Sequence, residues 1–200
     1  MGPPTDAELW QRACDGEPDA FGVLFERHSR AVYNFCFRQT ADWAAAEDLT
    51  SIVFLEAWRR RGEVRLKEGR ALPWLLGVAV NVLRNRRRSE RRHRAALERL
   101  EIPRGLDFAD EADSRLDDER RMRATLRTVA KLPRHEQEVL ALCVWAGLSY
   151  EDAALALCVP VGTVRSRLSR ARARVRELMS AHGHELGDDQ LAVHEAYEHD

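Results

Sequence analysis

"PVGTVRSRLSRARARVREL", residues 160–178, decides how the rest of the chain is interpreted. It places six arginines and no acidic residue between Thr163 and Arg176, in a chain of 200 residues with a formal net charge of −1. At about 100° per residue, its apolar side chains share one face of a helix. We expect this face to lie against a core: Val164, Leu168, Ala171, Val175 and Leu178.

The opposite face of this predicted helix is cationic. Its centre carries the small residues Ser166, Ser169 and Ala173, and arginines flank them at 165, 170 and 176. Such a surface can approach a flat, negatively charged partner closely. The alternative is a solvated helix in a bundle, but an average exposed helix mixes acids with its arginines. The composition therefore favours DNA as the partner.

The preceding residues complete a helix-turn-helix. The sequence from Ser149 to Asp152 has the pattern of a capping box, which predicts a helix start there. A short turn at 159–162 follows, with Thr163 as the expected N-cap of the arginine-rich helix. The second helix of such a motif lies in the DNA major groove, with its N-terminal residues at the base edges. Its arginines can neutralise phosphates or contact guanine.

A second cationic helix is predicted from Pro73 onward, because proline is favoured in a first helical turn. Leucines and alanine form its apolar face. The opposite face combines an aromatic ring, two amides and arginines, which suits single-stranded nucleic acid through stacking, base recognition and phosphate contact; it consists of Trp74, Asn81, Arg84, Asn85 and Arg88. Two alternatives remain: Trp74 packs in a core, and the arginines form a solvated charge run.

Helical periodicity extends over nearly the whole chain, and charge divides it. Residues 84–99 carry +6, residues 101–119 carry −6 and residues 182–200 carry −6. We therefore predict an all-α fold of two small helical domains, at 1–100 and 119–181, joined by an acidic flexible linker at 101–118. The second domain contains the helix-turn-helix, and an acidic tail follows at 182–200.

Residues 44–60 form a helix with apolar residues on two sides. Leu49, Ile52 and Val53 lie on one side, and Phe54, Leu55 and Trp58 lie on the other. A helix that is apolar nearly all round is deeply buried or meets a second partner. The acids near its start complement the helix dipole, or they belong to a protein-docking face. Sequence physics alone leaves both interpretations open.

Other features narrow the class of protein. The N-terminus lacks a secretory signal, and the longest nearly uncharged apolar stretch, Ala71–Leu83, is shorter than the about 20 residues of a membrane span. Four scattered cysteines predict free, buried thiols and a cytoplasmic location. The sequence has no phosphate-binding glycine loop, metal-ligand spacing or paired nucleophile and base. We predict that the protein is not an enzyme and needs no cofactor or metal.

Three segments carry a family resemblance: AAAEDLTSIVFLEAWRR at 44–60, LPWLLGVAVNVLRNRRRS at 72–89, and the succession from LPRHEQEVL to PVGTVRSRLSRAR between 132 and 172. Over about Phe21 to Leu178 the chain resembles the extracytoplasmic-function (group 4) sigma factors, bacterial transcription initiation factors of the sigma-70 family. The first two segments resemble the family's region 2, and the third resembles region 4. Ser51 departs from the pattern, since the family has glutamine there.

The resemblance implies three binding surfaces. The helix at 44–60 would bind core RNA polymerase through Glu47, Asp48, Leu49 and Glu56. The face from Trp74 to Arg88 would capture an unpaired base of the promoter −10 element around Asn81. The arginine-rich helix would meet the duplex −35 element through Arg165, Ser166, Arg167, Ser169 and Arg170. Arg167 falls at the core edge of the helix, so we expect it to contact phosphate.

The resemblance also implies partners beyond the promoter. Members of the family are often held by an anti-sigma protein, which makes such a protein a candidate partner, and no membrane insertion is expected. The alternative function is a free-standing helix-turn-helix regulator. That class of protein would bind duplex DNA alone and would not need the Asn81 face.

Overall fold

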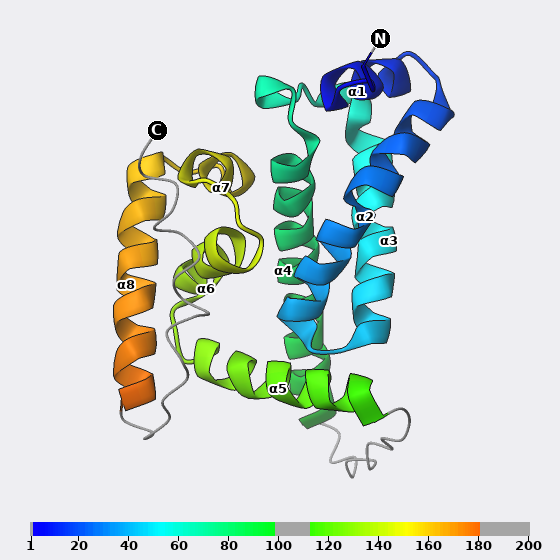
Figure 1. The fold of residues 1–200 in the computed structure, drawn as a ribbon. Coiled ribbons are helices and arrows are strands. Elements are labelled where there is room, and N and C mark those ends of the chain that lie inside the picture. Colours follow the sequence, from blue (N-terminus) through cyan, green and yellow to red (C-terminus); the bar gives the residue numbers. More distant parts are fainter. Residues whose placement is uncertain (1, 99–112, 181–200) are drawn as a thin grey trace.

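The computed structural model describes residues 2–98 and 113–180, and every regular element within them is a helix (Figure 1). The predicted all-α fold is confirmed. The first unit contains α1 (Asp6–Cys14), α2 (Pro18–Thr40), α3 (Trp43–Arg60), η1 (Arg61–Glu63), η2 (Lys67–Gly69) and α4 (Ala71–Glu98). The second contains α5 (Asp113–Val129), α6 (Arg134–Leu140), the π-helical turn η3 (Ala141–Trp145), α7 (Tyr150–Leu157) and α8 (Val161–Ser180).

The first unit is built on a tight hairpin of α2 and α3. Ala41 ends α2 in the left-handed conformation, with φ 51°, and Asp42 caps α3 by accepting a hydrogen bond from the Ala45 N–H at 2.9 Å. Apolar side chains of α2, α3 and α4 meet between the helices. Burying each of them stabilises the unit by about 1.5–3 kcal/mol; they include Leu24, Val32, Val53, Leu75 and Leu76.

The second unit contains the predicted helix-turn-helix. The Ser149 hydroxyl accepts a hydrogen bond from the Asp152 N–H at 3.0 Å and so caps α7 as predicted. The predicted N-cap at Thr163 is wrong, because α8 already begins at Val161 and the Thr163 N–H donates to the Pro160 carbonyl. Pro160 can stand at this boundary because its fixed φ fits a helix start and a first turn leaves backbone N–H groups unpaired.

The structure also differs from the prediction at the end of the linker. Helix α5 begins at Asp113, inside the range 101–118 that charge patterning assigned to the linker. Residues 99–112, and the acidic tail predicted at 182–200, lie outside the described residues. The linker and tail assignments therefore stay predictions.

The two units pack against each other, which the sequence did not predict. Helix α4 lies between the α2–α3 hairpin and the helices α6 and α7, as Figure 1 shows. Helix α2 also contacts η3, and one continuous hydrophobic core extends through both units. Both sides of α4 are therefore in contact with protein.

Asp6 anchors the N-terminus of the first unit. Its carboxylate accepts hydrogen bonds from the Arg27 guanidinium at 2.5 Å and from the Ala71 N–H, the first of α4, at 3.1 Å. The Nε2 atom of His28 lies 2.8 Å away. Burial alone would raise the pKa of Asp6, but these hydrogen bonds and the His28 charge outweigh it, so its pKa lies below the ordinary 3.8.

We predict that Asp6→Asn lowers the free energy of unfolding at pH 7 by about 1–2 kcal/mol, because Ala71, Arg27 and His28 lose a charged acceptor. A carboxylate with a depressed folded-state pKa stabilises above its unfolded pKa, and this contribution is lost as the pH falls through the folded pKa. Urea titrations below about pH 5 should therefore show a shallower acid-induced loss for the variant. An identical pH dependence in variant and wild type would contradict this, and Glu26→Gln, at an exposed acid of α2, is the control.

Candidate nucleic-acid and protein interfaces

The described side chains of α8 divide as its periodicity predicts. Four apolar side chains are buried against the second unit: Val164, Leu168, Ala171 and Val175. On the opposite side, the residues predicted to meet duplex DNA are exposed, namely Arg165, Ser166, Ser169 and Arg170, with Arg176 beyond them. Arg167 is only half-buried at the edge between these faces, which agrees with its predicted position.

A buried carboxylate orients part of this cationic face. Glu136 of α6 is 1% exposed, and its carboxylate accepts a hydrogen bond from the Arg174 guanidinium at 3.0 Å. The Nε atom of Arg170 lies 4.0 Å from the same carboxylate. Near the start of α8, the Arg165 guanidinium lies over the Tyr150 ring at 5.5 Å. The arginines are therefore positioned by α6 and α7 rather than free along the whole helix.

The predicted single-strand face of α4 is present but partly occupied. Asn81, Asn85 and Arg88 are exposed. Arg84 instead makes a bidentate ion pair with Glu138 of α6, at 2.7 and 2.6 Å, which raises the pKa of Arg84. It also donates to the Asn81 side-chain oxygen at 3.2 Å. In this arrangement Arg84 is held by a carboxylate of the second unit.

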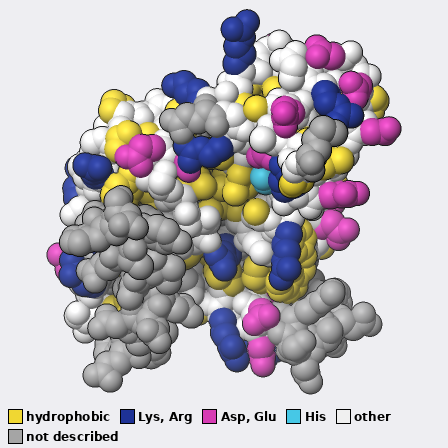
Figure 2. All heavy atoms as spheres, turned by 45° about the horizontal axis from the view of Figure 1, so that its top comes forward, with side chains coloured by type: hydrophobic (Ala, Val, Ile, Leu, Met, Phe, Trp, Pro, Cys, Tyr) yellow, Lys and Arg dark blue, Asp and Glu magenta, His cyan; other side chains and the backbone are white. Residues whose placement is uncertain are grey.

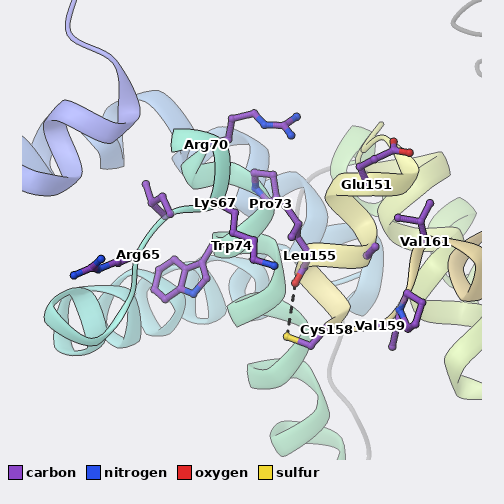
Figure 3. A pocket seen from close by; sticks show the side chains of 13 residues that line it. Arg65, Lys67, Arg70, Pro73, Trp74, Glu151, Leu155, Cys158, Val159 and Val161 are labelled. Carbon is purple, nitrogen blue, oxygen red and sulfur yellow. Dashed lines mark hydrogen bonds between the residues drawn. The ribbon is translucent and has the colours of Figure 1, made fainter.

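The position of Trp74 fits both interpretations of its role, as a core residue and as a stacking surface. Its ring packs edge-on against Trp10, with centroids 5.0 Å apart, so one side belongs to the core of the first unit. The other side lines a groove of about 680 Å³ between the two units, which Figure 3 shows from close by. Arg65 and Lys67 line the same groove near Trp74, and Leu155 of α7 lies across it. Trp74 is thus a core residue with one accessible side.

Figure 2 looks onto the face that carries the starts of α4 and α7. Hydrophobic surface lies in its centre, Lys and Arg side chains stand around it, and acidic side chains gather along one edge. Cations beside exposed apolar surface suit a partner that offers both phosphate and bases, or a protein with acidic side chains.

The exposed side chains of α3 differ in part from the residues predicted to dock a protein. Glu47 and Asp48 are exposed and Glu56 is half-buried, but Leu49 is 3% exposed and belongs to the core. The apolar side chains that do face outward are Ile52, at 43% exposed, and Leu55, at 55%. Asp48, Ile52 and Leu55 follow at helical spacing and form one stripe. Leu49 therefore packs in the core in this structure, and Ile52 and Leu55 are the apolar side chains of this stripe that a partner could reach.

Two apolar side chains of α2 are also exposed. Val23 and Phe25 are about as exposed as Ile52, and the Phe25 ring stacks edge-on against Phe54 of α3 at 4.8 Å. Scattered exposed hydrophobic residues are normal, but a contiguous group of them marks an interaction site.

No group of three metal-ligating side chains occurs within residues 2–98 and 113–180. All four cysteines are free thiols, but only Cys36 and Cys143 are buried as predicted, whereas Cys14 is half-buried and Cys158 is exposed at the end of α7. Burial raises the pKa of Cys36 and Cys143 to about 11, so both stay protonated at neutral pH. No helix in these two described ranges is long and apolar enough to span a membrane.

Comparison with known families matches both units. Residues 24–93 match the family model described as Sigma-70 region 2, and residues 122–175 match Sigma-70, region 4. The chain is 32% identical over 171 residues to the RNA polymerase sigma factor CarQ of Myxococcus xanthus, covering 84% of this chain and 94% of CarQ. It is 32% identical over 181 residues to the RNA polymerase sigma-H factor of Pseudomonas aeruginosa, covering 84% and 90% of the two chains.

Solved structures with a similar fold are complexes. CnrH bound to the cytosolic domain of CnrY matches with a TM-score of 0.64 at 25% identity, over 88% of this chain and 97% of that one. The sigma factor RpoE of Bartonella quintana, bound to the anti-sigma factor NepR, matches with a TM-score of 0.53 at 23% identity, over 80% and 96%. The latter likeness supports the fold alone.

We predict that truncation of two leucines of α3 changes the stability by very different amounts. Leu49→Ala should lower the free energy of unfolding by about 2–4 kcal/mol, because it leaves a cavity in the core. Leu55→Ala should change it by less than about 0.5 kcal/mol, because Leu55 lies on the surface. Chemical denaturation measures both values. Equal losses in the two variants would mean that α3 is rotated from the orientation described.

Proposed function

The chain belongs to the sigma-70 family of RNA polymerase sigma factors, and we propose how its three surfaces divide the work of transcription initiation. It is a sigma factor: it binds core RNA polymerase and directs promoter recognition and transcription initiation. The observation that carries this function is the joint match to region 2 and region 4, in the order and over the units that hold the two cationic helices.

Region 4 reads the duplex −35 element through α8. The helix-turn-helix presents the start of α8 as a recognition helix, where side chains reach base edges in the major groove. Arg165 and Arg170 contact guanine or phosphate, and the small Ser166 and Ser169 let the helix approach closely. Arg167, at the core edge, contacts phosphate. The exposure of all but Arg167 supports this assignment.

Region 2 captures single-stranded −10 DNA on α4. An unpaired base has free Watson–Crick edges, and the exposed Asn81 and Asn85 amides can pair with them. Arg88 and, once released from Glu138, Arg84 hold the backbone phosphates. Trp74 offers its accessible side for stacking. This assignment rests on the exposed amides, with cations on the same helix.

The outward stripe of α3 binds core RNA polymerase. Ile52 and Leu55 supply an apolar centre, and the surrounding acids Glu47, Asp48 and Glu56 supply charge complementarity to a basic partner surface. A centre of this kind carries most of the affinity of an interface, whereas charges at its edge steer association.

An anti-sigma protein is a further partner. The similar solved structure of CnrH is a complex with the cytosolic domain of CnrY, and we infer a bound protein of that kind for this chain. Two further predictions follow from this function. The chain acts in the cytoplasm on polymerase and promoter DNA, and it has no catalysis of its own. The free-standing regulator is disfavoured, because region 2 is a polymerase-binding region in the family.

We predict that Leu55→Ala weakens binding to core polymerase about tenfold while the chain stays folded, because an apolar contact at the centre of the interface is lost. Surface plasmon resonance with immobilised core polymerase measures the affinity. Arg12→Ala, at an exposed position of α1 outside this stripe, is the control. Full retention of affinity by the Leu55 variant would show that this stripe does not bind polymerase.

We predict a crossed pattern for two variants in run-off transcription, on a promoter whose start site has been mapped. Arg165→Ala should reduce transcription about tenfold when the −35 element is present and much less when it is replaced. Asn81→Ala should reduce it on both templates, because it impairs capture of the unpaired base, and permanganate reactivity of the melted strand should fall with it. An Arg165 effect that ignores the −35 sequence, or undiminished melting with the Asn81 variant, would refute the corresponding assignment.

A further inference from the structure

Helix α1 contacts the loop that joins α3 to α4, residues 61–70, at both of its ends and in its middle. At the end of the loop, Asp6 accepts a hydrogen bond from the Ala71 N–H at 3.1 Å. Just before it, Gly69 has φ +68°, and a Cβ atom added there would lie 3.1 Å from the Cβ of Ala7. Glycine therefore lets the loop turn and pass close to α1.

At the start of the loop, Arg61 and the last turn of α1 hold each other. The Arg61 guanidinium donates to the Ala13 carbonyl at 3.1 Å, and the Cys14 thiol donates to the Arg61 carbonyl at 3.2 Å. The last carbonyls of a helix lack intrahelical partners, and a cation there complements the helix dipole. Arg61 also donates to the Trp58 carbonyl at 2.7 Å. This arginine thus ties the end of α3 to the end of α1.

Trp10 connects the middle of the loop to the proposed single-strand face. Its indole N–H donates to the Val64 carbonyl at 3.1 Å, and its ring, which is 4% exposed, packs edge-on against Trp74. One side chain of α1 therefore fixes both the path of the loop and the position of the Trp74 ring.

The backbone bonds that close the loop are long. The Val64 N–H reaches the Arg61 carbonyl at 3.4 Å, and the Arg70 N–H reaches the Lys67 carbonyl at 3.3 Å, both beyond the usual range of about 2.7–3.2 Å. The contacts with α1 therefore contribute much of what fixes the loop.

The loop carries cations to the groove beside Trp74. Arg65 and Lys67 are exposed and line this groove together with the accessible side of the Trp74 ring (Figure 3). An aromatic ring with cations beside it can stack a base and hold the phosphates of the same strand. Such a site tolerates displacements of only about 0.5 Å, so the residues that support it decide how well it discriminates.

We propose that α1 is a positioning element for −10 recognition: it holds the loop so that its cations stay beside Trp74, and it sets the discrimination among −10 sequences without touching the DNA. The proposal rests on the proposed function of region 2. Trp10 is the central positioning residue, since it contacts the loop and Trp74 at once, and Arg61 is the second.

The alternative is that α1 only completes the core of the first unit. Leu9 and Ala13 are buried, and their packing alone would stabilise the fold. A purely stabilising role would change transcription from all templates by the same factor, because loss of folded chain lowers the activity on each of them equally. The ratio of activities on two templates would then stay constant, so this ratio separates the two roles.

The first test uses holoenzyme reconstituted from core polymerase and the full chain. Run-off transcription is measured on a mapped promoter and on templates in which one base pair of the −10 element is replaced. Trp10→Phe removes the indole N–H and keeps an aromatic ring in the core. The ratio of activity on the native template to that on the replaced ones should fall about fivefold, the worth of one net hydrogen bond. The corresponding ratio for the −35 element should keep its wild-type value.

Trp43→Phe is the matched control. Trp43 begins α3, at the opposite end of that helix from the loop, and its ring stacks on Phe37. Its buried indole N–H has no hydrogen-bond partner among the residues that the structure describes. The variant removes the same atoms from an aromatic cluster without releasing the loop, so both ratios should keep their wild-type values.

A second variant changes the loop from its start. Arg61→Lys keeps the positive charge but loses the planar fork that donates to two carbonyls at once. The −10 ratio should fall in this variant as well, and this variant decides the question if Trp10→Phe does not fold. Its control is Arg59→Lys, at an exposed arginine that pairs with Glu56 on the same helix.

A second measurement needs neither polymerase nor promoter. Hydrogen exchange of the full chain, followed by mass spectrometry, reports how tightly the amides of the loop are held. Residues 61–70 should exchange about fivefold faster in Trp10→Phe than in the wild type, for the same loss of one hydrogen bond. In Trp43→Phe they should exchange at the wild-type rate.

The proposal is overturned if the loop exchanges at the wild-type rate in both Trp10→Phe and Arg61→Lys, or if it exchanges faster while the −10 ratio stays unchanged. An equal fall of the −35 ratio, or the same behaviour in the control variants, would overturn it too. A wild-type holoenzyme that transcribes equally from native and replaced −10 templates would instead sink the proposed function of region 2. The two failures are distinguishable, because the wild type alone decides the latter and the variants decide the former.

Discussion

The whole molecule depends on one helix, α4, that is packed from both sides. Its apolar side completes the core of region 2 with Leu75, Leu76 and Leu83. Its other side carries the groups that we propose bind single-stranded DNA. A surface of amides and arginines is costly to bury against protein unless its charges are paired. Glu138 provides such a pairing for Arg84. The chemistry that suits α4 to DNA is therefore the same chemistry that lets region 4 cover it.

Periodicity and composition predicted much of this structure because they report on local constraints. The core stripe of α8 follows from the spacing of Val164, Leu168 and Ala171, and the Ser149 cap follows from a hydroxyl before a helical pattern. Thr163 failed as a cap because both Pro160 and Thr163 are compatible with a helix start. Such choices depend on which backbone groups the turn leaves unpaired.

The parts of the structure that were not predicted depend on tertiary contacts, and these cannot be inferred from the pattern of a single sequence. Helix α3 has apolar residues all round, and only the packed neighbours decide that Leu49 is buried while Leu55 faces outward. Glu136 and Glu138 lie two residues apart in a short helix, and nothing in their spacing indicates that one orients the arginines of α8 and the other holds Arg84. Alternating acidic and basic blocks indicated partners for the charges without indicating that some of them lie in the same chain.

The most direct measurement of the central claim is the distance between region 2 and region 4 before and after promoter binding. Fluorophores introduced through non-natural amino acids at the exposed positions Asn34 of α2 and Glu177 of α8 would report it by energy transfer. We predict high transfer in the free chain, where the two units are in contact, and low transfer in the complex of polymerase, sigma factor and promoter, where each unit binds a separate promoter element. Equal transfer in both states would contradict the account.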